Sequence, residues 1–230
     1  MGHFNWIQYL TNVEHQYAHV ATAIAVTVLI FAVGIYARIQ LGAGEKAVVP
    51  AGKFSVRGFF EMITEGTHTL AEQVIGHDGA LYVPLAAAIF TFVLINNLIG
   101  LLPGMTPATD NLNTSFAIGM FSFVYYNYIG IKSEGVKNYL LHFLGPVWWL
   151  AWLILPIELI SHAFRPLTLG LRLAGNITAD HTVVSVFHQL FPIGLPVPFY
   201  AMGLIVSLIQ AFVFALLTLV YVMLAKAHDH

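Results

Sequence analysis

Residues 19–41, HVATAIAVTVLIFAVGIYARIQL, form a nearly continuous apolar run whose one arginine lies close to its end. A bilayer core about 30 Å thick is crossed by roughly 20 apolar residues in a helix. In lipid the backbone must satisfy its own hydrogen bonds, and a helix does so within one segment. The run therefore predicts a membrane-spanning helix, and runs of the same kind follow at 81–102, 115–131 and 199–225.

The composition agrees with an integral membrane protein and excludes several other classes. Only 9% of the 230 residues are charged, against about 25% in average soluble domains. The sequence has no basic patch that would indicate a nucleic-acid partner. Without cysteine it has neither disulfides nor thiolate metal sites. His15 and His19 have a spacing that suits a metal but lie at the membrane edge, so we predict no metal and no other cofactor.

The whole chain, 1–230, is predicted to be a single all-α membrane domain with about five membrane helices. Residues 42–79 are polar, and within them FFEMITEGTHTLAEQVIG has helical periodicity with one apolar face. An amphipathic helix at the membrane interface is therefore predicted there. The lysines and arginines of the connecting segments fall on one side if residues 1–18 lie outside. The positive-inside rule then places the N-terminus outside and the C-terminus inside.

Residues 147–190 depart most from an ordinary span. They must begin inside, after Lys137, and end outside, before the final helix, so they cross the membrane an odd number of times. As one helix this segment would be about 65 Å long, roughly twice the hydrocarbon thickness, and three crossings would need more residues. One long, steeply tilted helix is therefore predicted, with Pro156 and Pro166 as kink sites.

Polar side chains follow one face of this long helix, because steps of three or four residues keep them together. The stripe consists of Glu158, His162, Arg165, Thr168, Arg172, Asn176 and Asp180, and a second, shorter row consists of His181, Ser185 and His188. The final helix adds Ser207 and Gln210, so both helices are expected to present polar groups to a shared crevice. Asn96 and Asn97 in the second span are expected either to make helix–helix hydrogen bonds or to line a channel.

The cost of a charge in lipid makes Arg172 the most informative of these residues. A charged side chain at the bilayer centre costs about 2.5–3.5 kcal/mol on insertion scales, and arginine does not lose its proton. Neither Asp180 nor Glu158 is spaced to pair with it along the helix. We infer an anion supplied by another chain; pairing with an internal acid or carbonyl stays open. For Glu158, Arg165 and His162, a structural ion network is the main alternative.

The run RPLTLGLRLAGNITADH, residues 165–181, followed by QAFVFALLTLVYV, residues 210–222, resembles subunit a of the F-type ATP synthase. The specific motifs are Arg172 in an L-R-L-x-G-N setting and Gln210 in Q-A-F-x-F, and NNLIGLLPG, residues 96–104, is also similar. The resemblance implies a non-catalytic stator subunit of a multi-subunit complex. Its implied partners are a rotating ring of small c subunits, each with one essential carboxylate, peripheral-stalk b subunits and membrane lipid. A bacterial inner membrane is the expected location.

The resemblance also implies roles for individual residues. Arg172 would face the ring carboxylates, with Gln210 and Asn176 beside it. The groups assigned to two offset proton half-channels are Asp180, His181, Glu158, Thr168, His162 and Ser207. A ring carboxylate must be protonated in lipid and can ionise beside a cation. Proton flow would thus be coupled to ring rotation and ATP synthesis, with the proton expected rather than sodium.

The chain departs from the family pattern in the outer half-channel. The family often has an acid five residues after the signature asparagine, whereas this chain has His181 there and the acid, Asp180, one residue earlier. Where the family often has histidine or an acid seven residues before the glutamine, this chain has Gly203. A rearranged outer relay, with Asp180 and His181 as a local pair, is therefore predicted.

Two other functions compete with this hypothesis. A secondary transporter could bind an anionic substrate at Arg172, but the sequence shows no internal repeat of the kind that such transporters use. A purely structural scaffold would have no need for a one-faced polar stripe around an arginine. Loss of coupled ATP synthesis on replacing Arg172 discriminates among the three hypotheses.

Overall fold

The computed structural model describes residues 6, 9, 14–41, 55–102, 104–142, 148–190 and 196–226, and all regular structure in these ranges is helical. The α-helices are α2 (Ala18–Leu41), α4 (Val56–Ile75), α5 (Val83–Gly100), α6 (Leu112–His142), α7 (Ala151–Leu190) and α8 (Pro196–Lys226). Short 3-10 helices are η1 (His15–Tyr17), η2 (His77–Tyr82), η3 (Ala108–Asp110) and η4 (Trp148–Leu150). The predicted all-α architecture is confirmed.

Three of the predicted spans correspond to helices that are long and apolar enough to cross a membrane. Within the described residues these segments are Ala18–Leu41, His77–Gly100 and Val197–Lys226. The helices α6 and α7 are not among them, because their polar side chains lower the mean hydropathy of the segment. The chain is thus an all-helical membrane protein, and the count of five membrane helices stays a prediction.

Helix α6 is longer than the predicted span at 115–131. It continues through Lys132 to a kink at Gly135, and a second helical segment that contains Lys137 runs on to His142, although these charged residues suggested a loop. Lysine and glutamate are good helix formers, so charge alone does not end a helix. The break comes instead at Gly135, whose φ of 79° is accessible to glycine at little cost.

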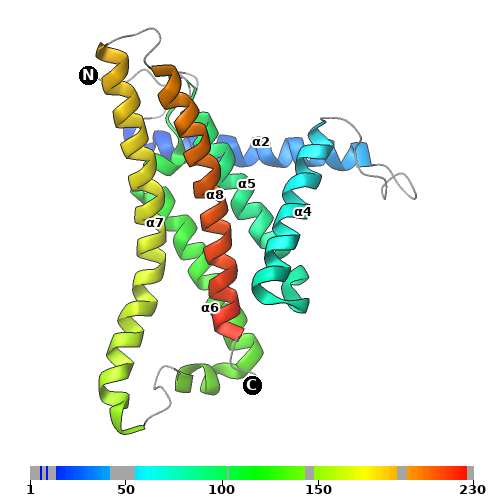
Figure 1. The fold of residues 1–230 in the computed structure, drawn as a ribbon, viewed down its shortest axis with the longest axis vertical. Helices are drawn as coiled ribbons and strands as arrows, with labels where there is room; N and C mark the ends of the chain where they lie inside the picture. The colour runs from blue at the N-terminus through cyan, green and yellow to red at the C-terminus, as the bar shows by residue number, and fades with distance from the viewer. Residues whose placement is uncertain are drawn as a thin grey trace.

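Helix α7 runs for 40 residues and continues through Pro156 and Pro166, which confirms that one long helix forms here. At 1.5 Å per residue it is about 60 Å long. Helix α2 runs across the direction of α7 and α8, which lie beside each other (Figure 1). Helices that cross in this way cannot both stand along the bilayer normal. Because α2 matches the bilayer thickness and α7 exceeds it, this arrangement supports a steep tilt of α7.

The core forms where α5, α7 and α8 meet, and α6 packs against both α7 and α8. Central side chains of this core are Ile89, Val93, Leu173, Ile177 and Phe214. The contact between α6 and α7 is a backbone contact through two glycines. A Cβ at Gly119 would lie 2.7 Å from the Pro166 carbonyl oxygen, and one at Gly170 would lie 2.9 Å from the Phe116 Cα. This contact helps to fix the rotation of α7.

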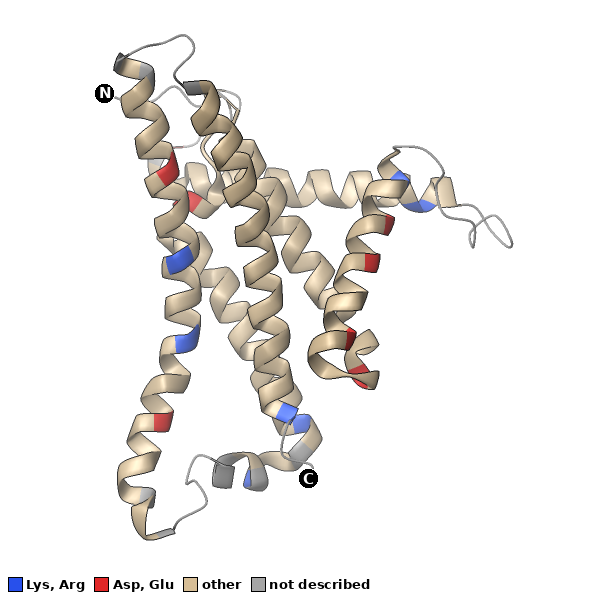
Figure 2. Cartoon of the chain, viewed as in Figure 1, with Lys and Arg blue, Asp and Glu red and all other residues tan. Residues whose placement is uncertain are grey.

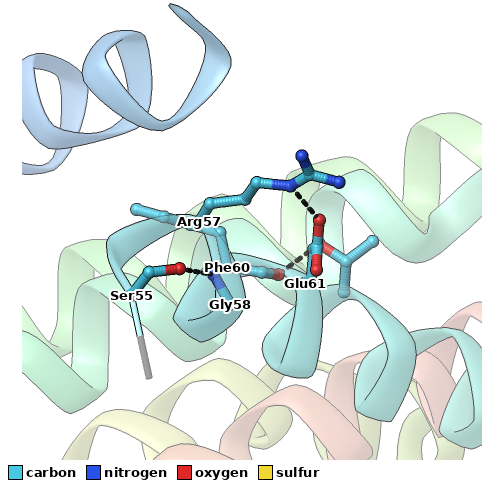
Figure 3. A network of polar contacts seen from close by, with 6 residues as sticks. Ser55, Arg57, Gly58, Phe60 and Glu61 are labelled. Atoms are coloured by element: carbon cyan, nitrogen blue, oxygen red, sulfur yellow. Dashed lines mark hydrogen bonds and ion pairs between the residues drawn. The ribbon is translucent and has the colours of Figure 1, made fainter. Parts of the chain in front are cut away.

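Helix α4 is the predicted amphipathic helix. Ser55 caps it, because its Oγ accepts a hydrogen bond from the Gly58 amide at 3.1 Å, and Arg57 pairs with Glu61 one turn later (Figure 3). Its buried side chains lie one turn apart and are Ile63, Thr67 and Ala71. Acidic residues lie along α4 and η2 (Figure 2). The helix itself is confirmed, and its place at the membrane interface stays a prediction.

A buried polar network ties the end of α5 to η3 and α6. The Thr109 hydroxyl donates to Oδ1 of Asn97 at 2.8 Å, and the Ser115 hydroxyl donates to the Thr109 carbonyl at 2.6 Å. Asn96 donates instead to the Phe92 carbonyl of its own helix at 2.8 Å. Within the described residues, the hydrogen bonds of the two asparagines therefore run to a 3-10 turn and within α5, rather than between membrane helices, which was one of the two predictions.

Replacing Thr109 with valine is expected to destabilise the protein by roughly 1–3 kcal/mol, because buried Oδ1 of Asn97 loses its donor. The measurement is the thermal dissociation midpoint of the purified complex in detergent. Thr64→Val is the matched control, since the Thr64 hydroxyl is exposed and bonds only to the Phe60 carbonyl of its own helix among the described contacts. Equal midpoints for the two variants would contradict the prediction.

Candidate functional site

Arg172 lies on an exposed face of α7, and within the described part of the chain no carboxylate forms an ion pair with its guanidinium. The surrounding surface of α7 and α8 is apolar and exposed. Its large side chains include Phe164, Leu171, Ile205, Leu208, Ile209 and Phe212. Next to Arg172, Gly175 adds no side-chain bulk, and a Cβ there would meet nothing within 4 Å. A permanent cation is thus presented outward on a surface suited to lipid or to another apolar helix.

Arg165, two turns away on the same helix, has a different environment. Its guanidinium lies 3.9 Å from Glu158 and 5.3 Å from the centre of the Tyr221 ring on α8. The predicted ion network therefore forms for Glu158 and Arg165. Figure 2 shows the charged residues of α7 spread along its length. Arg165 has an acid of its own chain beside it, whereas Arg172 has no such described partner.

Asn176 and Gln210 meet beside Arg172, as the two-helix crevice predicted. The Asn176 side-chain amide donates to Oε1 of Gln210 at 2.9 Å. Gln210 is 4% exposed and Asn176 is exposed, so the bond joins the outer face of α7 to the interior of α8. Asn176 follows Arg172 by one turn, which places this hydrogen bond on the same face of α7.

The C-terminal end of the stripe is held between α5 and α8. A Cβ added to Gly203 of α8 would lie 2.5 Å from Oδ2 of Asp180. A Cβ added to Gly100 of α5 would lie 2.8 Å from Nε2 of His181. Both side chains are half-buried. The predicted local pair of Asp180 and His181 stays a prediction, because the two side chains form no described ion pair and each also contacts a different helix. Adjacent residues of a helix point about 100° apart, so they reach different neighbours.

His162 marks the other end of the stripe and is 8% exposed. Its Nε2 lies 2.8 Å from Oδ1 of Asn127 on α6, and the Tyr139 hydroxyl donates to the same oxygen at 2.7 Å. Because an amide oxygen only accepts, Nε2 is the donor in this contact. The His162 ring also packs against Phe123 and Tyr126, with ring centres 5.0 and 5.5 Å apart. His162 thus braces α6 against α7 as well as lining a polar site.

A cavity of about 350 Å³ opens beside this brace. It is lined by Asn127, Ile131, Val136, Tyr139, Leu155, Leu159 and His162. The polar members converge on one amide oxygen, so the cavity offers groups that can hold water next to hydrocarbon walls. A second, more open apolar hollow of about 640 Å³ follows α7 past Arg172, where Thr178 donates to Asp110 at 2.7 Å.

The remaining predicted residues lie between these two ends. Ser207 is 2% exposed and follows Gly203 by one turn of α8. Thr168 is exposed and donates to the Arg165 carbonyl at 3.0 Å. The structure therefore brings Arg172, Asn176 and Gln210 together, and it separates the polar groups near the C-terminal end of α7 from those nearer its N-terminal end.

Sequence reasoning missed several polar residues on the His162 side of Arg172. Asn127, in YYNYIG, was a detectable signal, because it is a lone amide within an apolar span. Tyr139 lies beyond the predicted span and gave no such signal. The buried pair of Ser122 and Thr218, whose hydroxyls are 2.9 Å apart, joins α6 to α8. Such cross-helix bonds depend on how two helices rotate against each other.

The fold and the site together define a class: an all-helical membrane protein that presents an arginine without a described acid partner, with polar groups at both ends of the same helix. The profile of the family described as ATP synthase A chain matches residues 18–223. The chain therefore belongs to the ATP synthase A chain family, which confirms the resemblance found in the sequence. It is accordingly a subunit of the membrane sector of a multi-subunit ATP synthase.

Similar proteins cover the whole length of the chain. ATP synthase subunit a of Bdellovibrio bacteriovorus is 55% identical over 227 residues, which is 99% of each chain. ATP synthase subunit a of Geobacter sulfurreducens is 43% identical over 210 residues, or 90% of each chain. ATP synthase subunit a 2 of Syntrophotalea carbinolica is 37% identical over 228 residues, covering 99% of this chain and 94% of the relative. All three relatives are bacterial.

Proposed function

We propose that this chain conducts protons to and from the carboxylates of a rotating c-ring through two offset half-channels, and so couples proton flow to ATP synthesis. The observation that carries the proposal is the environment of Arg172. It is exposed on an apolar surface of α7 and α8, and the described chain offers its guanidinium no carboxylate. We infer that the anion that fits this position comes from another chain.

The chemistry follows from the cost of an ion in hydrocarbon. A ring carboxylate that faces lipid stays protonated, because a bare anion there is costly. Beside Arg172 it ionises, because a nearby cation favours the charged form. Its proton leaves toward one side of the membrane, and after the carboxylate passes Arg172 a proton enters from the other side. The cation also repels protons and thereby blocks a direct leak between the half-channels.

The outer half-channel would use Asp180, His181 and Ser207, and it would end at Asn176 and Gln210. Support comes from their burial between α5, α7 and α8 and from the Asn176–Gln210 hydrogen bond. Asp180 follows Arg172 by eight residues, or about 12 Å along the helix axis. A water-filled path through buried Ser207 would span that gap.

The inner half-channel would use Glu158, His162 and Thr168, which lie on the other side of Arg172 along α7. The cavity beside His162 supports this assignment, because it brings polar groups of α6 and α7 to one space. We place the N-terminus outside and the C-terminus in the cytoplasm of a bacterial inner membrane. Peripheral-stalk b subunits would anchor the chain against the torque of the ring. The transported ion is proposed to be the proton.

Single cysteines test the two-sided path directly, since the natural chain has none. In the complete complex, Ser207→Cys is expected to make ATP-driven proton pumping sensitive to silver ions added outside. Glu158→Cys is expected to make it sensitive to silver added inside. The control is Val28→Cys, whose side chain is 62% exposed on α2 and away from both paths.

The two sensitivities should each be confined to one face, because the half-channels are not continuous. Inhibition of both variants from both faces would indicate an open pore and contradict the proposal. In a transporter of an anionic substrate, silver would instead reach both cysteines from either face of the membrane in turn. Silver would then block anion uptake without affecting ATP synthesis.

A further inference from the structure

We propose that Gly203 and Gly100 are positioning residues of the outer half-channel, which leave room in α8 and α5 for the Asp180 carboxylate and the His181 imidazole. The inference rests on the function proposed above. Neither glycine has a side chain, and each borders one of the two titratable groups at this end of α7. We call the space over Gly203 the α8 notch and the space over Gly100 the α5 notch.

The α8 notch is occupied by the Asp180 carboxylate itself. A Cβ on Gly203 would lie 2.5 Å from Oδ2 and 3.3 Å from Cγ of Asp180, and 2.9 Å from Cδ2 of Leu101. The Leu101 methyl group is the end of a flexible side chain and can move. The distance of 2.5 Å to Oδ2 is shorter than real Cβ contacts, so the carboxylate or α8 itself has to shift. Even one added methyl group at position 203 would therefore displace the acid relative to α8.

The α5 notch holds the neighbouring imidazole in the same way. A Cβ on Gly100 would lie 2.8 Å from Nε2 of His181, and it would also lie 2.7 Å from Cγ of Pro107. The two groups sit on consecutive residues of α7 and enter notches in two different helices. Both titratable groups of this path are therefore carried by α7, the helix that also carries Arg172.

These two glycines differ from those that serve only close packing. At Gly119 and Gly170 the nearest atoms to an added Cβ belong to backbone, as expected where two helices touch. At Gly203 the nearest atom is a carboxylate oxygen, and at Gly100 an imidazole nitrogen is within 0.1 Å of being the nearest. The α8 notch thus holds one carboxylate, and the α5 notch holds one imidazole.

The test is a double-mutant cycle in the complete ATP synthase, read out as proton-driven ATP synthesis in membrane vesicles. Gly203→Ala is expected to lower the rate roughly 10-fold to 100-fold, since a displacement of about 1 Å can cost this much. In an Asp180→Ala background the same change is expected to have no further effect, because no carboxylate remains to be displaced. Gly66→Ala is the control, since a Cβ there meets nothing within 4 Å.

A wild-type rate for Gly203→Ala would overturn the inference, and so would a loss that simply adds to that of Asp180→Ala, because additivity indicates helix packing. If Gly203→Ala does not assemble, Asp180→Glu tests the same idea with α8 unchanged. The longer acid should overfill the notch and lower the rate at least several-fold, and an undiminished rate would overturn the inference. Failure of the proposed function is distinct, since it would appear as continued ATP synthesis after replacement of Arg172.

Discussion

Replacing Arg172 with alanine is expected to abolish proton-driven ATP synthesis. We expect a loss of at least ~100-fold, which corresponds to removing about 2.7 kcal/mol of electrostatic stabilisation. The guanidinium is exposed and has no described carboxylate partner, so its removal leaves none of the described acids uncompensated. The chain should therefore still insert and assemble. The measurements are ATP synthesis in energised vesicles and the amount of the chain in the purified complex.

Arg172→Lys separates charge from hydrogen-bonding geometry. Lysine keeps the positive charge, but it lacks the planar fork of donors and can lose its proton in an apolar setting. We expect this variant to be nearly as defective as alanine. Arg165→Lys is the matched control on the same helix. Since Arg165 already pairs with Glu158, we expect a loss of less than about 1 kcal/mol in stability, typical of a partly exposed ion pair, and retained synthesis. Normal synthesis by Arg172→Ala, in membranes shown to contain it, would reject the assignment.

Replacing Gly170 with alanine is expected to produce the largest structural defect among single methyl additions to α7. Its Cβ would lie 2.9 Å from the Phe116 Cα and 3.0 Å from the Phe116 nitrogen, and backbone atoms cannot rotate away. Overpacking of this kind costs about 1–3 kcal/mol. The thermal dissociation midpoint of the complex should fall accordingly.

The same change should also impair coupling, because Gly170 lies two residues before Arg172 and a shift of α7 would move the guanidinium relative to the ring. Gly119→Ala is expected to act similarly from the α6 side, since its Cβ would lie 2.7 Å from the Pro166 carbonyl oxygen. Gly34→Ala provides the comparison, because a Cβ there meets nothing within 4 Å. Wild-type midpoints for both Gly170→Ala and Gly119→Ala would contradict a backbone contact between α6 and α7.

Features that depend on local sequence could be predicted. The apolar run at 19–41 corresponds to α2 at Ala18–Leu41, and the long segment at 147–190 forms the single helix α7. Both follow from hydropathy and length alone. The contact of Asn176 with Gln210 was also predictable in outline, since each residue lies on a polar row of its own helix and the two helices are consecutive.

Features that depend on how helices rotate and cross could not be predicted. Asp180 and His181 are neighbours in the chain, yet their side chains enter notches in α8 and α5, because the surrounding helices decide which surfaces are open. His162 was expected on the proton path but also braces Asn127 of α6. No periodicity within α7 reveals such a partner on α6. The assignment of single channel residues therefore rests on contacts between helices.

The outward-facing guanidinium also bears on how the complex is built. A chain inserted alone would leave Arg172 against hydrocarbon, at a cost of about 2.5–3.5 kcal/mol, a sizeable fraction of the roughly 5–15 kcal/mol by which most folded proteins are stable. Under the proposed function, biogenesis would then favour delivering this chain to a preassembled rotor, whose acidic groups would neutralise the cation on arrival. Orphan copies, lacking that neutralisation, would be the species most exposed to membrane proteases.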